Sequence, residues 1–433
     1  MNIPDVRYAR SGTVAIAFQV VGDGPRDLLY SPPLIDLYSI WANPHIRPFL
    51  DRLAAEFRLI VFNPRGTGFS DKPRNITLEA RMDDIAAVLE TLGVHRVNLL
   101  GNSVGANTCA LFAASYPERC ERLVLQQVSP RGVATREYPY GESEEWWLDW
   151  IREIREHYGE RDFLESWARS VDPSVTESPE ALDWFVWGRR MAVSPAAAAD
   201  WARVGMETDI TEVLSAIRVP TLLMHRDDNR EIAAYVAGRV SNAQVIEVRS
   251  VHSEEASAAI LNFLRGEALP FVPDSVLATV LFTDLVGSTE RAAAVGDRRW
   301  REVLEEHHRA VRRELTRYRG VEVDTAGDGF FCSFDGPGRA IACARKIMEG
   351  ATELGLEVRA GIHTGECELV GEKIAGISVV TGARISSLAA PGEVLVSSTV
   401  KELVAGSGLS FEDRGEHALK GVPGAWRLYA AAE

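Results

Sequence analysis

Six short apolar runs recur through residues 1–265 and limit the fold more than any other feature of the sequence. They are DLLY, RLIVFN, RVNLLG, RLVLQQV, PTLLMH and QVIEV, and they alternate with stretches of helical periodicity. Continuous apolar runs of this length are typical of strands buried on both faces, and their alternation with helices indicates a mostly parallel sheet. We therefore expect an α/β domain over residues 1–265.

The alternation stops between about residues 142 and 208, where no strand pattern occurs. This range predicts a helical cap inserted into the α/β domain. It holds seven tryptophans: Trp146, Trp147, Trp150, Trp167, Trp184, Trp187 and Trp201. Packing of the cap helices on one another is the simpler explanation for them, and an aromatic pocket for an apolar ligand is the alternative.

The sequence GNSVG at residues 101–105 follows the strand VNLL and precedes a helical segment. A nucleophile elbow requires this strand–turn–helix context, since the glycines permit the tight turn that exposes Ser103. Together with NPRGTGFSDKP upstream, these 265 residues resemble the α/β-hydrolase family. The resemblance implies a hydrolase fold with Ser103 as nucleophile. It also implies oxyanion donors at the N–H groups of Leu34 and Val104, although Pro33 stands where the family usually has glycine.

The remaining members of a catalytic triad are less regular. His252, in EVRSVHSEE, follows the last strand, where the resemblance places the base; a structural histidine is the alternative. The acid position, four residues after His225, is Asn229, which cannot stabilise an imidazolium as a carboxylate does. Either Asp228 replaces it by a shift of one residue or the triad is broken. The domain is then either an esterase-like hydrolase of a small ester or lactone, or a sensor whose capped pocket binds a small molecule.

A second domain follows a short connecting segment. The segment RGEALPFVPDS carries two prolines and a glycine, so we predict a linker at residues 266–275. Beyond it, VLATVLFT predicts a strand, residues 297–318 predict an amphipathic helix, and VEVDTAGDGFFCSF predicts a hairpin. These elements predict a compact α+β domain over residues 276–433.

Two aspartates of this domain stand at turns. Asp284 ends the strand of LFTDLVGST, and Asp328 lies between glycines in AGDGF. Carboxylates at adjacent turns suit a pair of Mg²⁺ ions, and backbone N–H groups at Gly287, Ser288 and Thr289 suit phosphate oxygens. Taken alone, either aspartate is equally typical of an ordinary cap or turn.

The whole segment resembles class III adenylate/guanylate cyclases over about 160 residues. The matching stretches are LFTDLVGSTERAAAVGDRRW, TAGDGFFCSFDGPGRAI, VRAGIHTGE, VTGAR and ALKGVPGAWRLY. The resemblance implies a ferredoxin-like fold and a homodimer with active sites at its interface. It also implies two Mg²⁺ or Mn²⁺ ions on Asp284 and Asp328, assisted by the Leu285 carbonyl. An α/β-hydrolase domain in front of such a cyclase resembles an actinobacterial arrangement.

The resemblance assigns further roles in nucleotide cyclisation. Arg384, in GARIS, matches an arginine that the partner chain contributes to the transition state, and Arg359 and Lys420 match basic positions at the polyphosphate. The ribose 3′-hydroxyl of ATP or GTP would attack the α-phosphorus and release pyrophosphate, leaving a 3′,5′-cyclic monophosphate.

Three positions depart from the family pattern. Asp324 stands where adenylate cyclases read the purine with lysine, and Lys373 stands where they carry aspartate. Because lysine and aspartate together complement a guanine edge, we expect looser purine selection or a preference for GTP. Val380 replaces the asparagine that orients the ribose, so we expect slow turnover. The alternative is a non-catalytic module for dimerisation or nucleotide sensing, behind an active hydrolase.

Charge and composition exclude several other classes. The net charge of −15 argues against nucleic acid or an anionic membrane as partner. No run approaches eighteen apolar residues, and the first residues lack the basic and apolar regions of a signal peptide. The five cysteines are scattered, which argues against a metal cage or a disulfide framework. We therefore expect a soluble, cytoplasmic protein.

Overall fold

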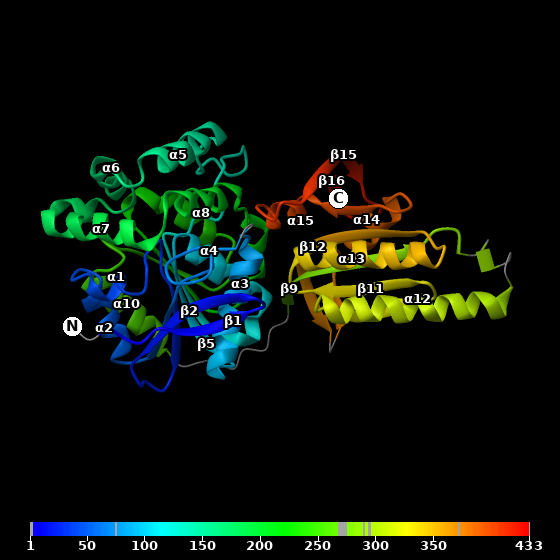
Figure 1. The fold of residues 1–433 in the computed structure, drawn as a ribbon, viewed down its shortest axis with the longest axis horizontal. Helices are drawn as coiled ribbons and strands as arrows, with labels where there is room; N and C mark the ends of the chain where they lie inside the picture. The colour runs from blue at the N-terminus through cyan, green and yellow to red at the C-terminus, as the bar shows by residue number, and fades with distance from the viewer. Residues whose placement is uncertain are drawn as a thin grey trace. The chain divides into compact units, whose positions relative to one another are not determined.

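The computed structural model describes residues 3–73, 76–266, 275–288, 291–292, 296–370 and 373–432. The chain divides into two compact units, Met1–Val272 and Pro273–Glu433, each with its own sheet and core (Figure 1). Across these described ranges, no helix has the length and apolar character needed to cross a membrane.

The N-terminal unit is built on an eight-stranded sheet of order β1-β2-β4-β3-β5-β6-β7-β8. Its strands are β1 (Arg7–Ser11), β2 (Val14–Val21), β3 (Asp27–Ser31), β4 (Arg58–Phe62), β5 (Val97–Asn102), β6 (Cys120–Gln126), β7 (Thr221–His225) and β8 (Ala243–Glu247). The pairings that involve β1 and β2 are antiparallel, and those from β4 to β8 are parallel. The six apolar runs form β3 to β8, which confirms the predicted α/β domain with a mostly parallel sheet.

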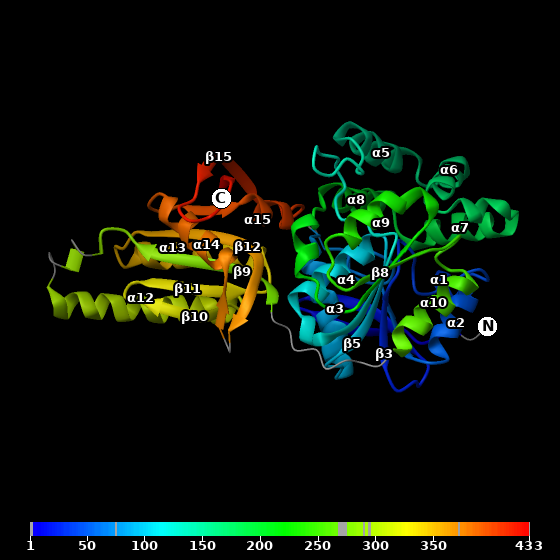
Figure 2. The same ribbon diagram turned by 180° about the vertical axis from the view of Figure 1, so that it is seen from behind.

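Helices cover both faces of this sheet. They are α1 (Ser39–Ala42), α2 (Arg47–Ala54), α3 (Leu78–Leu92), α4 (Val104–Ser115), α9 (Arg230–Ala237) and α10 (Glu254–Arg265). Figures 1 and 2 show α2 and α10 together on one side and α3 with α4 on the other. Phe49 of α2 and Ile260 of α10 pack on Leu28 and Tyr30 of β3, all of them buried. This core fixes the position of β5, whose C-terminal end leads into Ser103.

Four further helices follow β6 before the chain returns to β7. They are α5 (Glu144–His157), α6 (Arg161–Val171), α7 (Pro179–Ala192) and α8 (Pro195–Glu207). Ser143, Ser178 and Ser194 cap α5, α7 and α8 by accepting a hydrogen bond from an N–H group of the first turn. Trp167 is buried among the helices, while Trp187 is 40% exposed. Trp147, Trp150 and Trp201 pack against the same core as Trp167, so four of the seven tryptophans hold the helices together.

The C-terminal unit has an eight-stranded sheet whose main path is β10-β11-β9-β12-β14-β16-β15, with β13 beside β12. Its strands are β9 (Ser275–Leu285), β10 (Val321–Ala326), β11 (Gly329–Phe334), β12 (Val358–Val370), β13 (Lys373–Ala375), β14 (Val394–Ser397), β15 (Ser410–Ala418) and β16 (Ala425–Ala432). All pairings are antiparallel except β12 with β14. The predicted hairpin is β10–β11.

Helices lie on both faces of this second sheet. They are α12 (Asp297–Arg317), α13 (Pro337–Glu353), α14 (Ile377–Leu388) and α15 (Ser398–Leu403). Ala360 and Ile362 of β12 face the core beneath α12 and α13. Because side chains alternate along a strand, Gly361 faces α14 on the other side. A Cβ atom at Gly361 would lie 2.1 Å from the backbone nitrogen of Ser386, so glycine permits the close approach of this helix.

Candidate active sites

Ser103 occupies a strained turn between β5 and α4. Its φ of 56° and ψ of −124° lie in a region that residues with a side chain rarely adopt, and its N–H group donates to the Gln126 carbonyl at 3.0 Å. A Cβ atom at Gly101 would lie 2.6 Å from the Gly105 carbonyl oxygen, and one at Gly105 would lie 2.5 Å from the Ser31 carbonyl oxygen. Both glycines are therefore required sterically, and the turn has the geometry of a nucleophile elbow.

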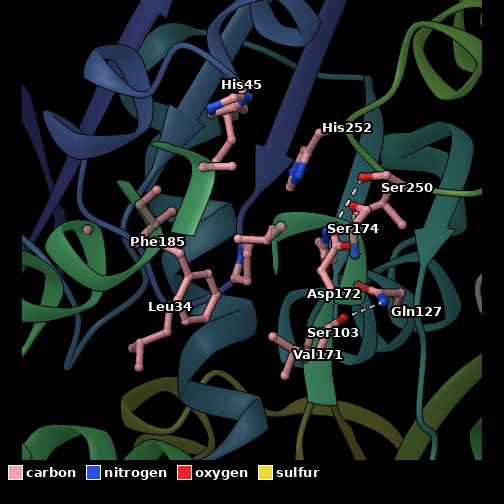
Figure 3. A pocket seen from close by; sticks show the side chains of 18 of the residues that line it. Leu34, His45, Ser103, Gln127, Val171, Asp172, Ser174, Phe185, Ser250 and His252 are labelled. Atoms are coloured by element: carbon pink, nitrogen blue, oxygen red, sulfur yellow. Dashed lines mark hydrogen bonds between the residues drawn. The ribbon is translucent and has the colours of Figure 1, made fainter. Parts of the chain in front are cut away.

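Ser103 opens into a cavity of about 510 Å³ between the strand ends and the cap helices (Figure 3). His252 and Leu34, two other predicted site residues, also line this cavity. Much of the remaining wall is aromatic and comes from α6, α7 and α8: Trp167, Trp184, Phe185 and Trp201. The sequence allowed two roles for the cap tryptophans, helix packing or an aromatic pocket. The structure shows both, since some of them pack between helices and some line this cavity.

His252 lines the cavity on the side where its ring packs against the core. Its Nε2 atom is 3.2 Å from the hydroxyl oxygen of the buried Tyr30, and its ring meets the Phe49 ring edge-on. Burial lowers the pKa of His252 to about 4, with Asp172 opposing and Arg189 reinforcing that shift. The imidazole is therefore neutral at physiological pH, the form that accepts a proton from a nucleophile. Within the described chain, no hydrogen bond joins it to Ser103.

The structure does not join Asp228 to His252. Asp228 forms an ion pair with Arg226, and its side chain is 51% exposed. Asp172, the residue after α6, lines the same cavity as His252, and its charge opposes the lowering of the His252 pKa by burial. Asp172 accepts a hydrogen bond from the Ser250 hydroxyl at 3.2 Å and lies 3.9 Å from Arg226. Sequence reasoning missed Asp172, because a cap residue remote from the histidine belongs to no motif.

The two predicted oxyanion residues come from different segments: Val104 directly follows Ser103, and Leu34 lies in the loop after β3. Val104 begins α4, while Leu34 lines the cavity and its carbonyl accepts a hydrogen bond from Arg189 of α7. Arg189 is a second pocket residue that sequence reasoning missed. Helical periodicity in the sequence does not distinguish an arginine that faces solvent from one that lines a pocket.

In the C-terminal unit, Asp284 and Asp328 approach one edge of the sheet. Asp284 is the penultimate residue of β9, and Asp328 lies in the turn of the β10–β11 hairpin. Thr283 pairs with Phe330, so this turn lies beside the end of β9. Arg359, opposite Asp284 in the β9–β12 ladder, donates to its Oδ2 atom from Nε at 3.0 Å and Nη2 at 2.5 Å.

The donor set of this edge fits divalent cations. The Oδ2 atom of Asp328 is buried without a hydrogen-bond partner, a costly arrangement that a cation would relieve. Leu285 follows Asp284 and offers a backbone carbonyl. The described residues contain no group of three or more His, Cys, Asp or Glu side chains suited to a metal. An ion here would take its other ligands from water and phosphate, as Mg²⁺ commonly does.

The predicted phosphate-binding turn follows directly. Gly287 has a φ of 67°, and its carbonyl accepts from the Arg291 N–H group at 3.0 Å, so the chain enters a helical turn here. Ser288 lies in this turn. Thr289, the third predicted phosphate contact, lies outside the described residues.

The two charge-swapped purine positions meet in space. Lys373 of β13 and Asp324 of β10 form an ion pair, with Nζ 3.8 Å from Oδ1 and both side chains more than half exposed. Asp324 also lines a cavity of about 320 Å³ together with Asp284, Arg359 and the aromatic ring of Phe331. A pair that can read a base edge therefore stands beside the aspartate and arginine that suit phosphates.

Arg384, Lys420 and Val380 do not line this cavity, although Ala383, Ser386 and Ser387 of α14 do. Arg384 of α14 donates from Nε to the Lys420 carbonyl at 3.1 Å, and neither residue lines the cavity. Val380, one turn earlier on α14, is 39% exposed. Helix α14 thus lines the cavity with Ala383, while the Arg384 side chain is directed to the Lys420 carbonyl.

Both units match known families. Residues 35–173 match the family of the alpha/beta hydrolase fold, and residues 274–431 match the adenylate and guanylate cyclase catalytic domain. A bifunctional esterase/perhydrolase from Acinetobacter calcoaceticus is 26% identical over 228 residues, which is 50% of this chain and 80% of that protein. Several other curated relatives match over less than half of their own length.

Solved structures show the same N-terminal fold. An esterase from Exiguobacterium antarcticum is 19% identical with a TM-score of 0.54, and a hydrolase from Pseudomonas aeruginosa is 23% identical with a TM-score of 0.52. Each alignment covers 61% of this chain and 100% of the other. At these identities, the likeness is one of fold.

Proposed function

The chain consists of an N-terminal α/β-hydrolase domain and a C-terminal adenylate/guanylate cyclase catalytic domain, and from this we propose that it converts ATP or GTP to the 3′,5′-cyclic monophosphate and pyrophosphate. The observation that carries the proposal is the pair Asp284 and Asp328 at one sheet edge, with an unpartnered buried oxygen on Asp328. Arg359 beside them supplies the positive charge that a polyphosphate requires.

Asp284, Asp328 and the Leu285 carbonyl would hold two Mg²⁺ or Mn²⁺ ions, which when bound activate the ribose 3′-hydroxyl and offset phosphate charge. Arg359 lines the cavity and is held beside Asp284 by two hydrogen bonds, so its positive charge would lie close to a polyphosphate bound there. Backbone N–H groups of the turn at Gly287 and Ser288 would bind further phosphate oxygens.

A homodimer would complete the site. The Arg384 side chain donates to the Lys420 carbonyl and does not line the cavity of its own chain, which supports its action on the site of a second copy. Helix α14, which carries Arg384, exposes Ile377, Val380 and Leu388, with exposed fractions of 54%, 39% and 46%. Apolar residues of this kind are commonly covered at a protein interface.

Asp324 and Lys373 would read the purine. Lysine donates to the guanine O6 atom while aspartate accepts from N1 and N2, so the pair suits GTP at least as well as ATP. Val380 offers the ribose no hydrogen bond, so we expect the rate to be modest.

The first test measures cyclic nucleotide formation by the purified full chain with Mn²⁺ and either ATP or GTP. We expect product from the wild type and none from Asp284→Ala or Asp328→Ala. Asp413→Ala is the matched control, because Asp413 is a surface aspartate of the same domain that pairs only with surface groups such as Arg427. Product that survives Asp284→Ala would refute the proposal. No product from a dimeric wild type would reduce the domain to a dimerisation or nucleotide-sensing module.

A second candidate activity, ester or lactone hydrolysis, rests on the strained backbone of Ser103 at a capped cavity. Neutral His252 would act as base, with the charge of Asp172 favouring the imidazolium that forms. Labelling by a fluorophosphonate probe tests it: we expect Ser103 to react, and the reaction to be lost in His252→Ala. Absence of labelling in folded protein would contradict hydrolysis and favour a ligand sensor.

A further inference from the structure

The N-terminal pocket contains a guanidinium with few partners. Arg189 of α7 donates one hydrogen bond, from Nη1 to the Leu34 carbonyl, while its Nε atom is buried without a partner. Its guanidinium carbon lies 4.6 Å from the ring centre of Phe185 and 5.4 Å from that of Trp167. The two rings lie close to the guanidinium, and among the described residues no hydrogen bond uses its Nε–Nη2 edge.

The charge of Arg189 is not offset by the protein. Throughout the described part of the chain, no carboxylate lies within ion-pair distance of it, and burial lowers its pKa. Arg226, the second cation that lines the pocket, is paired with Asp228 and Asp172. The other titratable lining groups are His45 and the neutral His252. Arg189 is partly buried, and its Nε atom is fully buried. A cation in such a position without a counter-ion is costly, and an anionic ligand would remove that cost.

The two ends of the pocket differ in charge. Figure 3 shows Leu34 and Phe185, which Arg189 contacts, on one side, and Asp172, Ser250 and Gln127 on the other. Asp172, which pairs with Arg226, therefore lies on the side of the pocket away from the groups that contact Arg189. A ligand with one negative charge at one end fits this arrangement better than a dianion, which the aspartates would repel.

We propose that this pocket binds a small organic monocarboxylate, whose two oxygens take the Nε–Nη2 edge of Arg189 and whose apolar body lies on the aromatic wall. A planar guanidinium edge matches the two oxygens of a carboxylate in spacing and direction. The cavity of about 510 Å³ has room for such a ligand. Because Arg189 also holds the Leu34 carbonyl, the carboxylate would lie near the predicted oxyanion loop and within reach of Ser103. The proposal specifies the ligand of the second candidate activity, yet it concerns binding and does not require turnover.

Calorimetric titration of the full chain with phenylbutyrate and with its neutral amide, phenylbutyramide, tests this binding. The two probes share shape and apolar area and differ in charge. We expect the acid to bind at least about tenfold more tightly, as charge-assisted hydrogen bonds imply. Equal affinities, or binding of neither probe, would overturn the proposal.

Variants assign the difference to Arg189. In Arg189→Gln, the preference for the acid should disappear, and in Arg189→Lys, which keeps the charge but loses the planar edge, it should shrink. Arg190→Gln is the matched control, since Arg190 is exposed and donates to the Gly159 carbonyl. If Arg189→Gln does not fold, the lysine variant and the wild-type comparison decide. A preference that persists undiminished in a folded Arg189 variant would overturn the proposal.

The outcome is separable from that of hydrolysis. Acid binding that persists in Ser103→Ala, together with absent fluorophosphonate labelling of the wild type, would support the carboxylate site while contradicting catalysis. Labelling of Ser103 with no preference for the acid would support catalysis and refute the carboxylate site.

Discussion

Replacing Gly361 by alanine tests how closely helix α14 is held to the cyclase sheet. The new Cβ atom would lie 2.1 Å from the backbone nitrogen and 2.4 Å from the Cα atom of Ser386. Ordinary van der Waals contact begins near 3.4 Å, so the overlap exceeds an ångström. Both opposing atoms belong to the helix backbone, so no side-chain rotation relieves the contact. The helix must move away from β12 or the strand must distort.

The magnitude follows from this geometry. Overpacking of this kind costs about 1–3 kcal/mol, and a contact with rigid backbone places Gly361→Ala toward the upper end. For a unit of this size, each kcal/mol lowers the unfolding temperature by roughly 2–4 °C. Because α14 also carries Arg384, a shift of about 1 Å would slow cyclisation by on the order of a hundredfold if Arg384 acts in catalysis.

Scanning calorimetry of the full chain and the rate of cyclic nucleotide formation measure the two effects. Gly350→Ala on α13 is the control, because a Cβ atom there meets no atom within 4 Å. That helical substitution should stabilise the domain by about 0.5–1 kcal/mol. An unfolding temperature and a rate unchanged in Gly361→Ala would show that the helix is not held at this distance, and would refute the reasoning.

Three further predictions concern the same domain. Exchanging the charges, with Asp324→Lys and Lys373→Asp together, should change the free energy of unfolding by less than about 1 kcal/mol because the pair is exposed. The exchange should nevertheless alter the ratio of the rates with ATP and GTP. An unaltered ratio would show that these residues do not read the purine. Val380→Asn should raise the cyclisation rate by on the order of tenfold at constant unfolding temperature, since it adds a ribose hydrogen bond at an exposed site; no gain in rate would mean that other groups position the ribose. Burial lowers the pKa of His363, whose Nδ1 atom is 2.9 Å from the Ser397 hydroxyl, to about 4. The unfolded chain therefore binds this proton more readily, and the domain should lose up to about 1.4 kcal/mol per pH unit as pH falls from 6.5 toward 4, with His363→Gln reducing that slope in pH-dependent calorimetry.

Local patterns in the sequence determined the elements and the turn geometry of this protein. Apolar runs predicted β3 to β8 because a strand buried on both faces needs apolar side chains throughout. The glycines around Ser103 predicted the elbow because only glycine fits the backbone approaches at residues 101 and 105. The aspartates of LFTDLVGST and AGDGF predicted carboxylates at a strand end and a hairpin turn, and Asp284 and Asp328 lie there. In each case, the information resides within a few consecutive residues.

Tertiary structure alone decided which charged groups meet. Asp228, predicted to replace Asn229 as the acid by a shift of one residue, pairs with Arg226, whereas Asp172 from the cap lines the cavity with His252. Arg189 resembles any helical arginine until folding buries it among aromatic rings beside the Leu34 carbonyl. The physical reason is that burial, pKa and ion pairing depend on distances between segments remote in sequence. Those distances follow from how the cap closes over the strand ends, which no local spacing records.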